Sequence, residues 1–206
     1  MADTVLFDLF GVIARQQSSS GQKLLVATAG VSAPVFWETY WALRMPYDRG
    51  EATGSEYWRQ VAAALGTTFD DHQIACLIAA DIASWSAVDA DMVALVEQTA
   101  ASGRRINLLS NIPEELAVHY EDHHRWLKHF DVVAFSCRIG HAKPEPDAYR
   151  WCCQTLDLAP GRILFVDDRA ENIQAAEAIG MRAHLFIDPT QARQAIAELD
   201  TAPRRR

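Results

Sequence analysis

Five short apolar segments, separated along the chain by other patterns, constrain the fold more than any other feature of the sequence. Their length and their content of Val, Ile, Leu and Phe are typical of strands buried on both faces. They are Val5 to Phe10, Ile106 to Leu109, Val132 to Ser136, Ile163 to Val166 and His184 to Ile187. Helical periodicity lies between the later segments, over Pro113 to His129, Glu145 to Leu156 and Ala170 to Ile179. This alternation predicts an α/β core in which helices cover a parallel sheet.

The long interval between the first and second segments contains helical patterns but no convincing strand pattern. Helices are expected over Pro34 to Arg44, Ser55 to Leu65 and Asp70 to Ala83, with a turn at Asp48-Arg49-Gly50. We therefore expect a core domain made of residues 1–14 and 86–206, and a small helical subdomain inserted at residues 15–85. The run Ser18-Ser19-Ser20-Gly21 is interpreted as a hinge.

Composition indicates a globular chain with a small-molecule partner. The 206 residues are 50% apolar, which is enough for a sizeable core. A net charge of −8 argues against nucleic acid or an anionic membrane surface as the partner. The 4 cysteines form no Cys-x-x-Cys pair and are expected to be free thiols in a reducing cytosol. The early apolar run is short and is interrupted by Asp8, so we predict no signal peptide or spanning helix and a cytoplasmic location.

Polar side chains follow the apolar segments at the points where parallel strands would end. They are Asp8 after the first segment, Ser110 and Asn111 after the second, Lys143 after the third, and Asp167 and Asp168 after the fourth. Ligands of such sheets bind outside the carboxyl ends of the strands. We therefore expect these side chains to meet on one rim.

Each of these residues also has an ordinary structural interpretation. Asp8 and Ser110 are typical turn residues, Lys143 is compatible with a solvated surface, and the pair at 167–168 with a helix cap. Taken together, these residues favour a cation-binding site, because adjacent carboxylates at the end of a buried strand repel one another unless a cation neutralises them. Mg²⁺ prefers oxygen ligands and is the expected cation.

Four motifs in this order resemble those of the haloacid dehalogenase-like hydrolase superfamily. They read FDLFGV, LLSN, KPEPDAY and FVDDRAENI, with the helical insertion after the first, and the resemblance covers about residues 5–188. It implies a Rossmann-like core with a small helical cap, Mg²⁺ bound between the first and fourth motifs, and an aspartate nucleophile. The implied substrate is a small phosphorylated metabolite, cleaved through an aspartyl-phosphate.

Carried over by position, the resemblance implies a role for each of these residues. Asp8 is similar to the nucleophile, and Lys143 to the cation that offsets developing charge. Ser110 and the backbone of Asn111 are similar to the groups that hold the transferred phosphoryl group. The implied metal ligands are Asp8, the main-chain carbonyl of Phe10, Asp168 and, directly or through water, Asp167, with Asn172 supporting this loop.

Phe10 departs from the phosphatase pattern. In the phosphatases, an acid at this position protonates the leaving alcohol and later activates water, a role typically worth about 10²–10⁴-fold in rate. The dehalogenases have an aromatic residue there, but they use no metal and lack the acidic pair. The leading hypothesis is a Mg²⁺-dependent phosphatase. The alternatives are a 2-haloacid dehalogenase, a phosphotransferase or hydrolase of activated phosphates, and a binding or regulatory protein with weak turnover.

The expected insertion is dense in aromatic residues, namely Trp37, Tyr40, Trp41, Tyr47, Tyr57 and Trp58. Trp37 and Trp41 lie four residues apart on one helix face, so we predict that this pair packs in the insertion's own core. Arg44, in the same segment, is predicted to contact an anionic group of the substrate.

Overall fold

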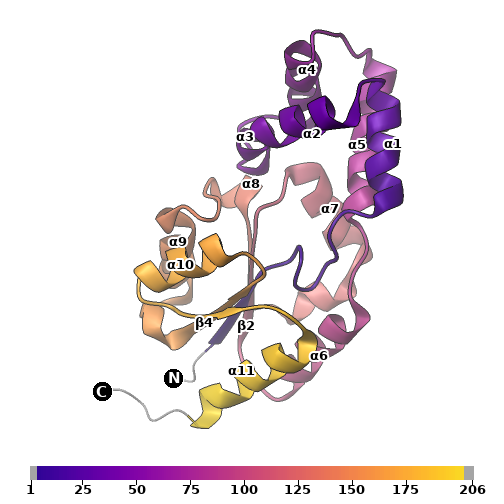
Figure 1. Cartoon of the computed structure of the whole chain (residues 1–206). Coiled ribbons are helices and arrows are strands. Elements are labelled where there is room, and N and C mark those ends of the chain that lie inside the picture. The colour runs from indigo at the N-terminus through magenta and orange to yellow at the C-terminus, as the bar shows by residue number, and fades with distance from the viewer. Residues whose placement is uncertain (1–3, 202–206) are drawn as a thin grey trace.

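A five-stranded parallel sheet forms the centre of the molecule. The computed structural model describes residues 4–201, and the strands lie in the order β3-β2-β1-β4-β5. They span Thr4–Phe7 (β1), Ile106–Ser110 (β2), Val132–Phe135 (β3), Ile163–Asp167 (β4) and Arg182–Leu185 (β5). The first strand pairs with both β2 and β4 and is therefore central (Figure 1). The predicted α/β fold with a parallel sheet is confirmed.

Helices cover both faces of this sheet. One face is covered by α6 (Ala90–Ala101), α7 (Glu114–His123) and α11 (Pro189–Thr201), and the other by α9 (Pro146–Leu156) and α10 (Ala170–Ala178). Shorter elements complete the core, namely η1 (Arg125–His129), α8 (Ser136–Ile139) and η2 (Pro160–Arg162). Across residues 4–201, every helix is too short or too polar to span a bilayer.

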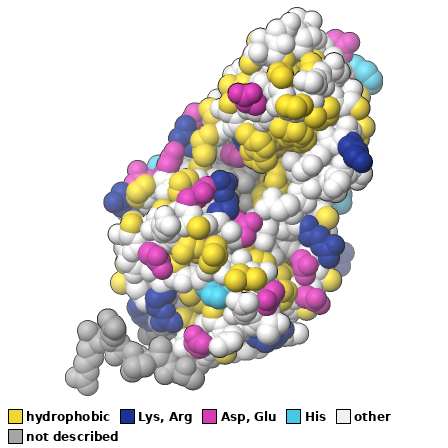
Figure 2. Space-filling model, in the orientation of Figure 1, with side chains coloured by type: hydrophobic (Ala, Val, Ile, Leu, Met, Phe, Trp, Pro, Cys, Tyr) yellow, Lys and Arg dark blue, Asp and Glu magenta, His cyan; other side chains and the backbone are white. Residues whose placement is uncertain are grey.

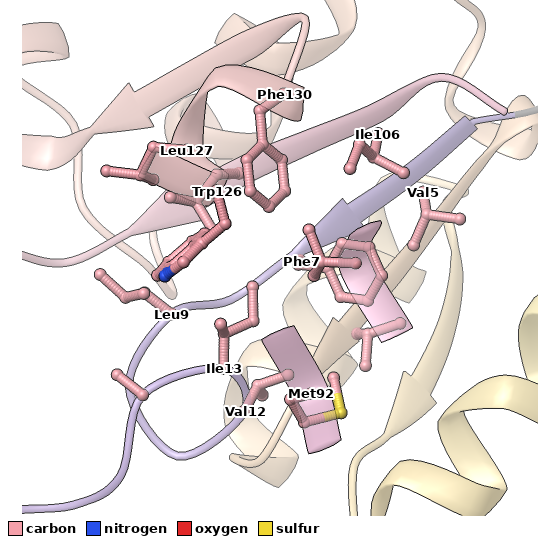
Figure 3. Packing of buried hydrophobic residues seen from close by; sticks show 14 of the residues in the cluster. Val5, Phe7, Leu9, Val12, Ile13, Met92, Ile106, Trp126, Leu127 and Phe130 are labelled. Atoms are coloured by element: carbon pink, nitrogen blue, oxygen red, sulfur yellow. The ribbon is translucent and has the colours of Figure 1, made fainter. Parts of the chain in front are cut away.

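Side chains of β1 alternate between the two hydrophobic clusters, as the geometry of a strand requires. Val5 and Phe7 belong to the cluster under α6 and α7, whereas Leu6 belongs to the cluster under α9 and α10. In the first cluster, the rings of Phe7 and Phe130 meet edge to face with centroids 6.4 Å apart (Figure 3). Both faces of the central strand are thus buried, which fixes the position of the loop that follows it.

Five helices between β1 and α6 have a hydrophobic cluster of their own, and we call Ser19–Trp85 the insertion. Its helices are α1 (Ser19–Ala29), α2 (Ala33–Ala42), α3 (Arg44–Asp48), α4 (Gly54–Ala64) and α5 (Asp71–Trp85). Local sequence sets where they begin, because Ser18 and Asp70 cap α1 and α5, and Thr53 and Glu56 form a reciprocal capping box on α4. Figure 1 shows the insertion at one end of the molecule.

Several element boundaries differ from the sequence prediction. β1 ends at Phe7 and not at Phe10, so Asp8 lies in the loop after the strand. The fifth strand begins at Arg182, two residues before the predicted start. Residues 18–21, predicted as a hinge, form the start of α1, where the Ser18 side chain accepts a hydrogen bond from the Gly21 amide. The sequence prediction also lacks α1, α3, α6, α8 and α11.

Polar contacts dock the insertion against the core. Glu115 of α7 accepts hydrogen bonds from the Tyr47 hydroxyl at 2.9 Å and from the Gly54 amide at 2.7 Å. Arg49, just after α3, forms a 2.8 Å ion pair with Glu145 at the start of α9. Two further contacts join the core to the insertion, because the Ser136 hydroxyl donates to the Asp48 carbonyl and the Tyr120 hydroxyl donates to the Trp85 carbonyl.

Candidate active site

Three carboxylates meet at the carboxyl ends of two neighbouring strands. Asp8 follows β1 directly, Asp167 is the last residue of β4, and Asp168 comes next. Phe7 and Val166 are partners in the sheet, so the fold brings the residues after them to the same edge. One oxygen from each carboxylate lies within 4.8 Å of the other two. The structure therefore brings together the three acids at the rim where the sequence placed them.

Lys143 lies between two of these carboxylates. Its Nζ is 2.6 Å from Asp8 Oδ1 and 2.7 Å from Asp167 Oδ2, and the residue is only 2% exposed. Burial lowers the pKa of Lys143, but the carboxylates of Asp8 and Asp167 raise it by more, so its pKa lies above the ordinary value and the side chain is a cation. One cation thus faces three carboxylates, and the site retains an excess of negative charge.

Burial and the neighbouring charges shift the pKa values of the three carboxylates in different directions. Burial raises the pKa of Asp8 well above its ordinary value, although Lys143 opposes the rise. Burial also acts to raise the pKa of Asp167, but Lys143 and the Arg169 amide outweigh it, so that pKa lies below the ordinary value. Burial and the neighbouring Asp167 raise the pKa of Asp168. Asp8 and Asp168 are therefore the acids that a further positive charge would stabilise most as carboxylates.

Asp167 is saturated with donors from the protein. Its Oδ1 accepts from the Arg169 amide at 2.8 Å and from Asn172 Nδ2 at 3.0 Å. Its Oδ2 accepts from Lys143 Nζ at 2.7 Å and from the same Asn172 amide at 2.9 Å. Asn172 thus supports this loop, and Asp167 orients Lys143.

Asp168 has a buried carboxylate oxygen that the described protein groups leave unused. Its Oδ1 is buried and has no hydrogen-bond partner within the described part of the chain, while Oδ2 accepts from Gln16 Nε2 at 3.0 Å. Gly11, with φ at +87°, lies so close that an added Cβ would be 2.0 Å from Asp168 Oδ2. A buried, unpartnered carboxylate oxygen beside two further carboxylates is a donor set that suits a hard divalent cation.

Gln16 and Gly11 are site residues that the sequence reasoning missed. A glycine directly after Phe10 is a signal that was available, because a positive φ and a close backbone approach both favour glycine. Nothing in the pattern singles out Gln16, since its partner is 152 residues away.

Ser110 and Asn111, at the end of β2, differ in what their side chains do. Ser110 is fully buried, and its Oγ has no hydrogen-bond partner among residues 4–201. The Asn111 side chain accepts from the Lys143 amide at 2.8 Å and donates to the Lys143 carbonyl at 2.7 Å. Asn111 therefore positions the backbone of Lys143, whereas the Ser110 hydroxyl is buried without a protein partner in the described part of the chain.

Phe10 stands where the resemblance would place a second acid. The ring is partly buried, with its centroid 4.9 Å from that of Trp85 and 5.6 Å from that of Tyr120. An aromatic contact of this kind holds the ring in place and offers no proton to a leaving group.

Two predictions for the insertion need correction. Arg44 is 6% exposed, with Nε 2.8 Å from Asp48 Oδ1 and Nη1 2.8 Å from Asp81 Oδ2, so it is neutralised inside the insertion and is not placed to bind a substrate anion. Trp41 is 51% exposed, so the prediction that it packs in the insertion's core is wrong. Tyr40, on the same helix, is fully buried and packs in the hydrophobic cluster of the insertion.

The sequence matches the family model of haloacid dehalogenase-like hydrolases over residues 2–180. The chain therefore belongs to this family of hydrolases, as its four motifs predict. The parallel core and the carboxylate cluster at its rim agree with that membership.

Curated relatives match parts of the chain. Bifunctional epoxide hydrolase 2 of Rattus norvegicus is 37% identical over 65 residues, which are 32% of this chain and 12% of that protein. Sesquiterpene phosphatase astK of Aspergillus oryzae is 32% identical over 94 residues, which are 45% of this chain and 47% of that protein. The chain thus spans less than half the length of these relatives.

Solved structures share the fold over most of the chain. The family enzyme BT-2542 of Bacteroides thetaiotaomicron, in complex with magnesium and inorganic phosphate, has a TM-score of 0.71 at 18% identity and covers 89% of this chain and 93% of its own. The L-2-haloacid dehalogenase RSc1362 has a TM-score of 0.69 at 16% identity and covers 95% and 99%. At these identities the likeness establishes the fold.

Proposed function

We propose that this hydrolase is a Mg²⁺-dependent phosphatase that acts on a small phosphorylated compound through a phosphoryl group carried on Asp8. The observation that supports it most is the buried and unpartnered Oδ1 of Asp168 beside two further carboxylates. A relative described as a phosphatase and a fold neighbour solved with magnesium and phosphate point in the same direction.

Four groups of this chain are proposed to hold the ion. They are the carboxylates of Asp8 and Asp168, the main-chain carbonyl of Phe10 and, directly or through water, Asp167. Asp168 is the stronger candidate for a direct ligand, because Asp167 is already occupied by protein donors. When bound, Mg²⁺ offsets the negative charge of the carboxylates and of the phosphoryl oxygens.

In the first step, an Asp8 carboxylate oxygen attacks phosphorus. The bond between phosphorus and the leaving oxygen breaks, and the leaving group departs with that electron pair. Lys143, which already contacts Asp8 Oδ1, stabilises the charge that develops on the phosphoryl oxygens, and the Ser110 hydroxyl donates a hydrogen bond to one of them. Asn111 keeps Lys143 in position.

In the second step, water attacks the phosphorus of the aspartyl-phosphate, which releases phosphate and restores the Asp8 carboxylate. Phe10 can neither protonate the leaving oxygen in the first step nor deprotonate water in the second. Substrates whose leaving groups are stable as anions are therefore favoured, and the covalent phosphoryl-enzyme is long-lived.

A 2-haloacid dehalogenase is the second candidate, and Phe10 is the observation that favours it, because a halide leaves without a proton. The charge of the site opposes it. In a metal-free reaction, Lys143 would be the cation that neutralises three carboxylates, one oxygen of each lying within 4.8 Å of the others.

A substrate panel run with Mg²⁺ and with a chelator tests the proposal. We expect Mg²⁺-dependent release of phosphate from aryl and acyl phosphates, weaker release from alkyl phosphates, and none from Asp8→Asn. Chelator-resistant release of halide from 2-haloacids would instead establish the dehalogenase. Inertness toward every substrate would favour a binding protein.

A further inference from the structure

Three aromatic side chains extend from the loop of the proposed nucleophile to the surface of the insertion, and we call Phe10, Trp85 and Trp41 the aromatic wall. Phe10 lies two residues after Asp8, and its ring centroid is 4.9 Å from that of Trp85 at the end of α5. Trp85 in turn meets Trp41 of α2 edge to face at 6.3 Å. The wall is thus continuous from the site to the insertion.

Trp41, the outermost residue of the aromatic wall, is only partly covered by other residues. Trp85 is 7% exposed, whereas Trp41 is 51% exposed. Met45, four residues further along, is also exposed. Figure 2 shows hydrophobic side chains gathered over α2 and continuing toward the core. Trp41 thus exposes ring area to solvent two ring contacts away from the loop of Asp8, and a ligand that covers this area gains hydrophobic burial.

The cation nearest to Trp41 in the sequence is not available to an anionic substituent of the substrate. Arg44, three residues after Trp41, is buried and paired with Asp48 and Asp81. A ring or other flat apolar group would meet the exposed face of Trp41 and gain both area burial and a stacking contact.

We propose that the substrate is a phosphate ester of an aromatic hydroxyl compound, with its ring against Trp41. This inference rests on the proposed phosphatase function and specifies its substrate class. Two independent features lead to it. The wall favours an aromatic leaving group, and Phe10 requires one that departs without a proton. A phenolate satisfies both, because a phenol has a pKa of about 10, far below that of an alkyl alcohol.

The test compares 2-naphthyl phosphate, phenyl phosphate and acetyl phosphate, each with Mg²⁺. Wild type is expected to prefer the naphthyl ester to the phenyl ester. Trp41→Ala should lower kcat/KM for 2-naphthyl phosphate roughly tenfold, mainly through KM, and leave acetyl phosphate within about twofold. Trp41→Phe should retain most of the preference. Val35→Ala, which removes another exposed apolar side chain of α2, is the matched control and should change nothing.

The outcomes separate the two proposals. If acetyl phosphate is hydrolysed with Mg²⁺ by wild type but the naphthyl preference is missing, or if Trp41→Ala lowers kcat/KM for 2-naphthyl phosphate and acetyl phosphate equally, the aromatic substrate class is wrong and the phosphatase stands. If wild type hydrolyses none of the three, both proposals fail.

Discussion

Gly11 and Phe10 show how much of the site depends on atoms next to the nucleophile. Gly11 allows the Asp168 carboxylate to approach the loop after β1, and the Phe10 ring occupies the place where an acid would act. Both residues lie within three positions of Asp8, so one short loop carries both the close approach to Asp168 and the position where the resemblance would place an acid. A single substitution at Gly11 or at Phe10 therefore has an expected and measurable effect.

Gly11→Ala should weaken Mg²⁺ binding, because its Cβ would lie 2.0 Å from Asp168 Oδ2. Gly30→Ala is the matched control, since Gly30 also has a positive φ but has nothing within 4 Å of an added Cβ. Both variants should lose about 1–2 kcal/mol of stability through backbone strain. Calorimetric titration should show about tenfold weaker Mg²⁺ binding for Gly11→Ala alone. Equal affinities in the two variants would remove Gly11 from the site.

Phe10→Asp should restore part of the missing acid function, typically worth about 10²–10⁴-fold, toward alkyl phosphates. The gain toward aryl phosphates should be smaller, because their leaving groups depart without a proton. Phe10→Leu removes the ring contact with Trp85 without adding a carboxylate and should give no gain. Steady-state kinetics on both ester classes measure the effect. A folded, Mg²⁺-binding Phe10→Asp protein that gains no more than Phe10→Leu would contradict the phosphatase mechanism.

At the scale of elements, the insertion is held to the core by a small number of polar contacts. Glu115 of α7 accepts from Tyr47 of α3 and from Gly54 at the start of α4, so one carboxylate joins two helices of the insertion to the core. The Tyr47–Glu115 contact is partly buried, which makes it stronger than an exposed one.

Glu115→Ala should loosen the insertion without unfolding the core. It leaves the Gly54 amide and the Tyr47 hydroxyl without their acceptor, which costs about 1–3 kcal/mol of docking. Hydrogen exchange should rise in α3 and α4 and stay unchanged in the strands. Glu114→Ala is the control, because Glu114 pairs with Arg138 within the core. Equal exchange in the two variants would show that Glu115 does not hold the insertion.

The sequence predicted the strands better than their ends. The apolar run from Val5 continues past the strand because Leu9, in the loop, is as fully buried as the strand itself. A run of apolar residues therefore indicates which residues are buried, but it does not indicate where the hydrogen bonding between strands ends. The fifth strand is at the sheet edge, and its first residues Arg182 and Ala183 are only half buried, so its pattern is weak.

The same reasoning explains which site residues could be predicted. Asp8, Lys143 and Asp168 follow strands or a motif, and the topology of a parallel sheet brings such positions together. Arg44 was misassigned because one of its partners, Asp81, is 37 residues away on another helix, and a one-dimensional pattern does not show such a pairing.

At the scale of the whole molecule, Mg²⁺ should stabilise the protein because it neutralises an excess of buried negative charge. At a concentration of 100 times Kd, one bound ion adds about 2.7 kcal/mol to the free energy of unfolding. For a chain of this size we expect a rise in Tm of about 5–10 °C. A chelator should reverse it.

The variant Asp168→Asn tests whether the stabilisation by Mg²⁺ comes from an ion bound at the carboxylate cluster. It should abolish the rise in Tm with Mg²⁺, and it should make the metal-free protein more stable than wild type, because it removes like-charge repulsion with Asp167. Asp71→Asn, at a highly exposed carboxylate, should respond to Mg²⁺ as wild type does. Thermal denaturation with Mg²⁺ and with chelator measures the Tm of each variant and of wild type. An unchanged Mg²⁺ response in Asp168→Asn would mean that the ion binds elsewhere.

Asp8 is proposed to carry the phosphoryl group during turnover, and trapping that group on the protein tests this proposal. Because Phe10 cannot activate water, the covalent form should accumulate during turnover. Wild type mixed with Mg²⁺ and an aryl phosphate, quenched in acid and digested, should yield a phosphorylated peptide that contains Asp8. Asp8→Asn, or wild type in chelator, should yield none. Mg²⁺-dependent turnover without this peptide, or with the phosphoryl group on another residue, would show that Asp8 is not the nucleophile.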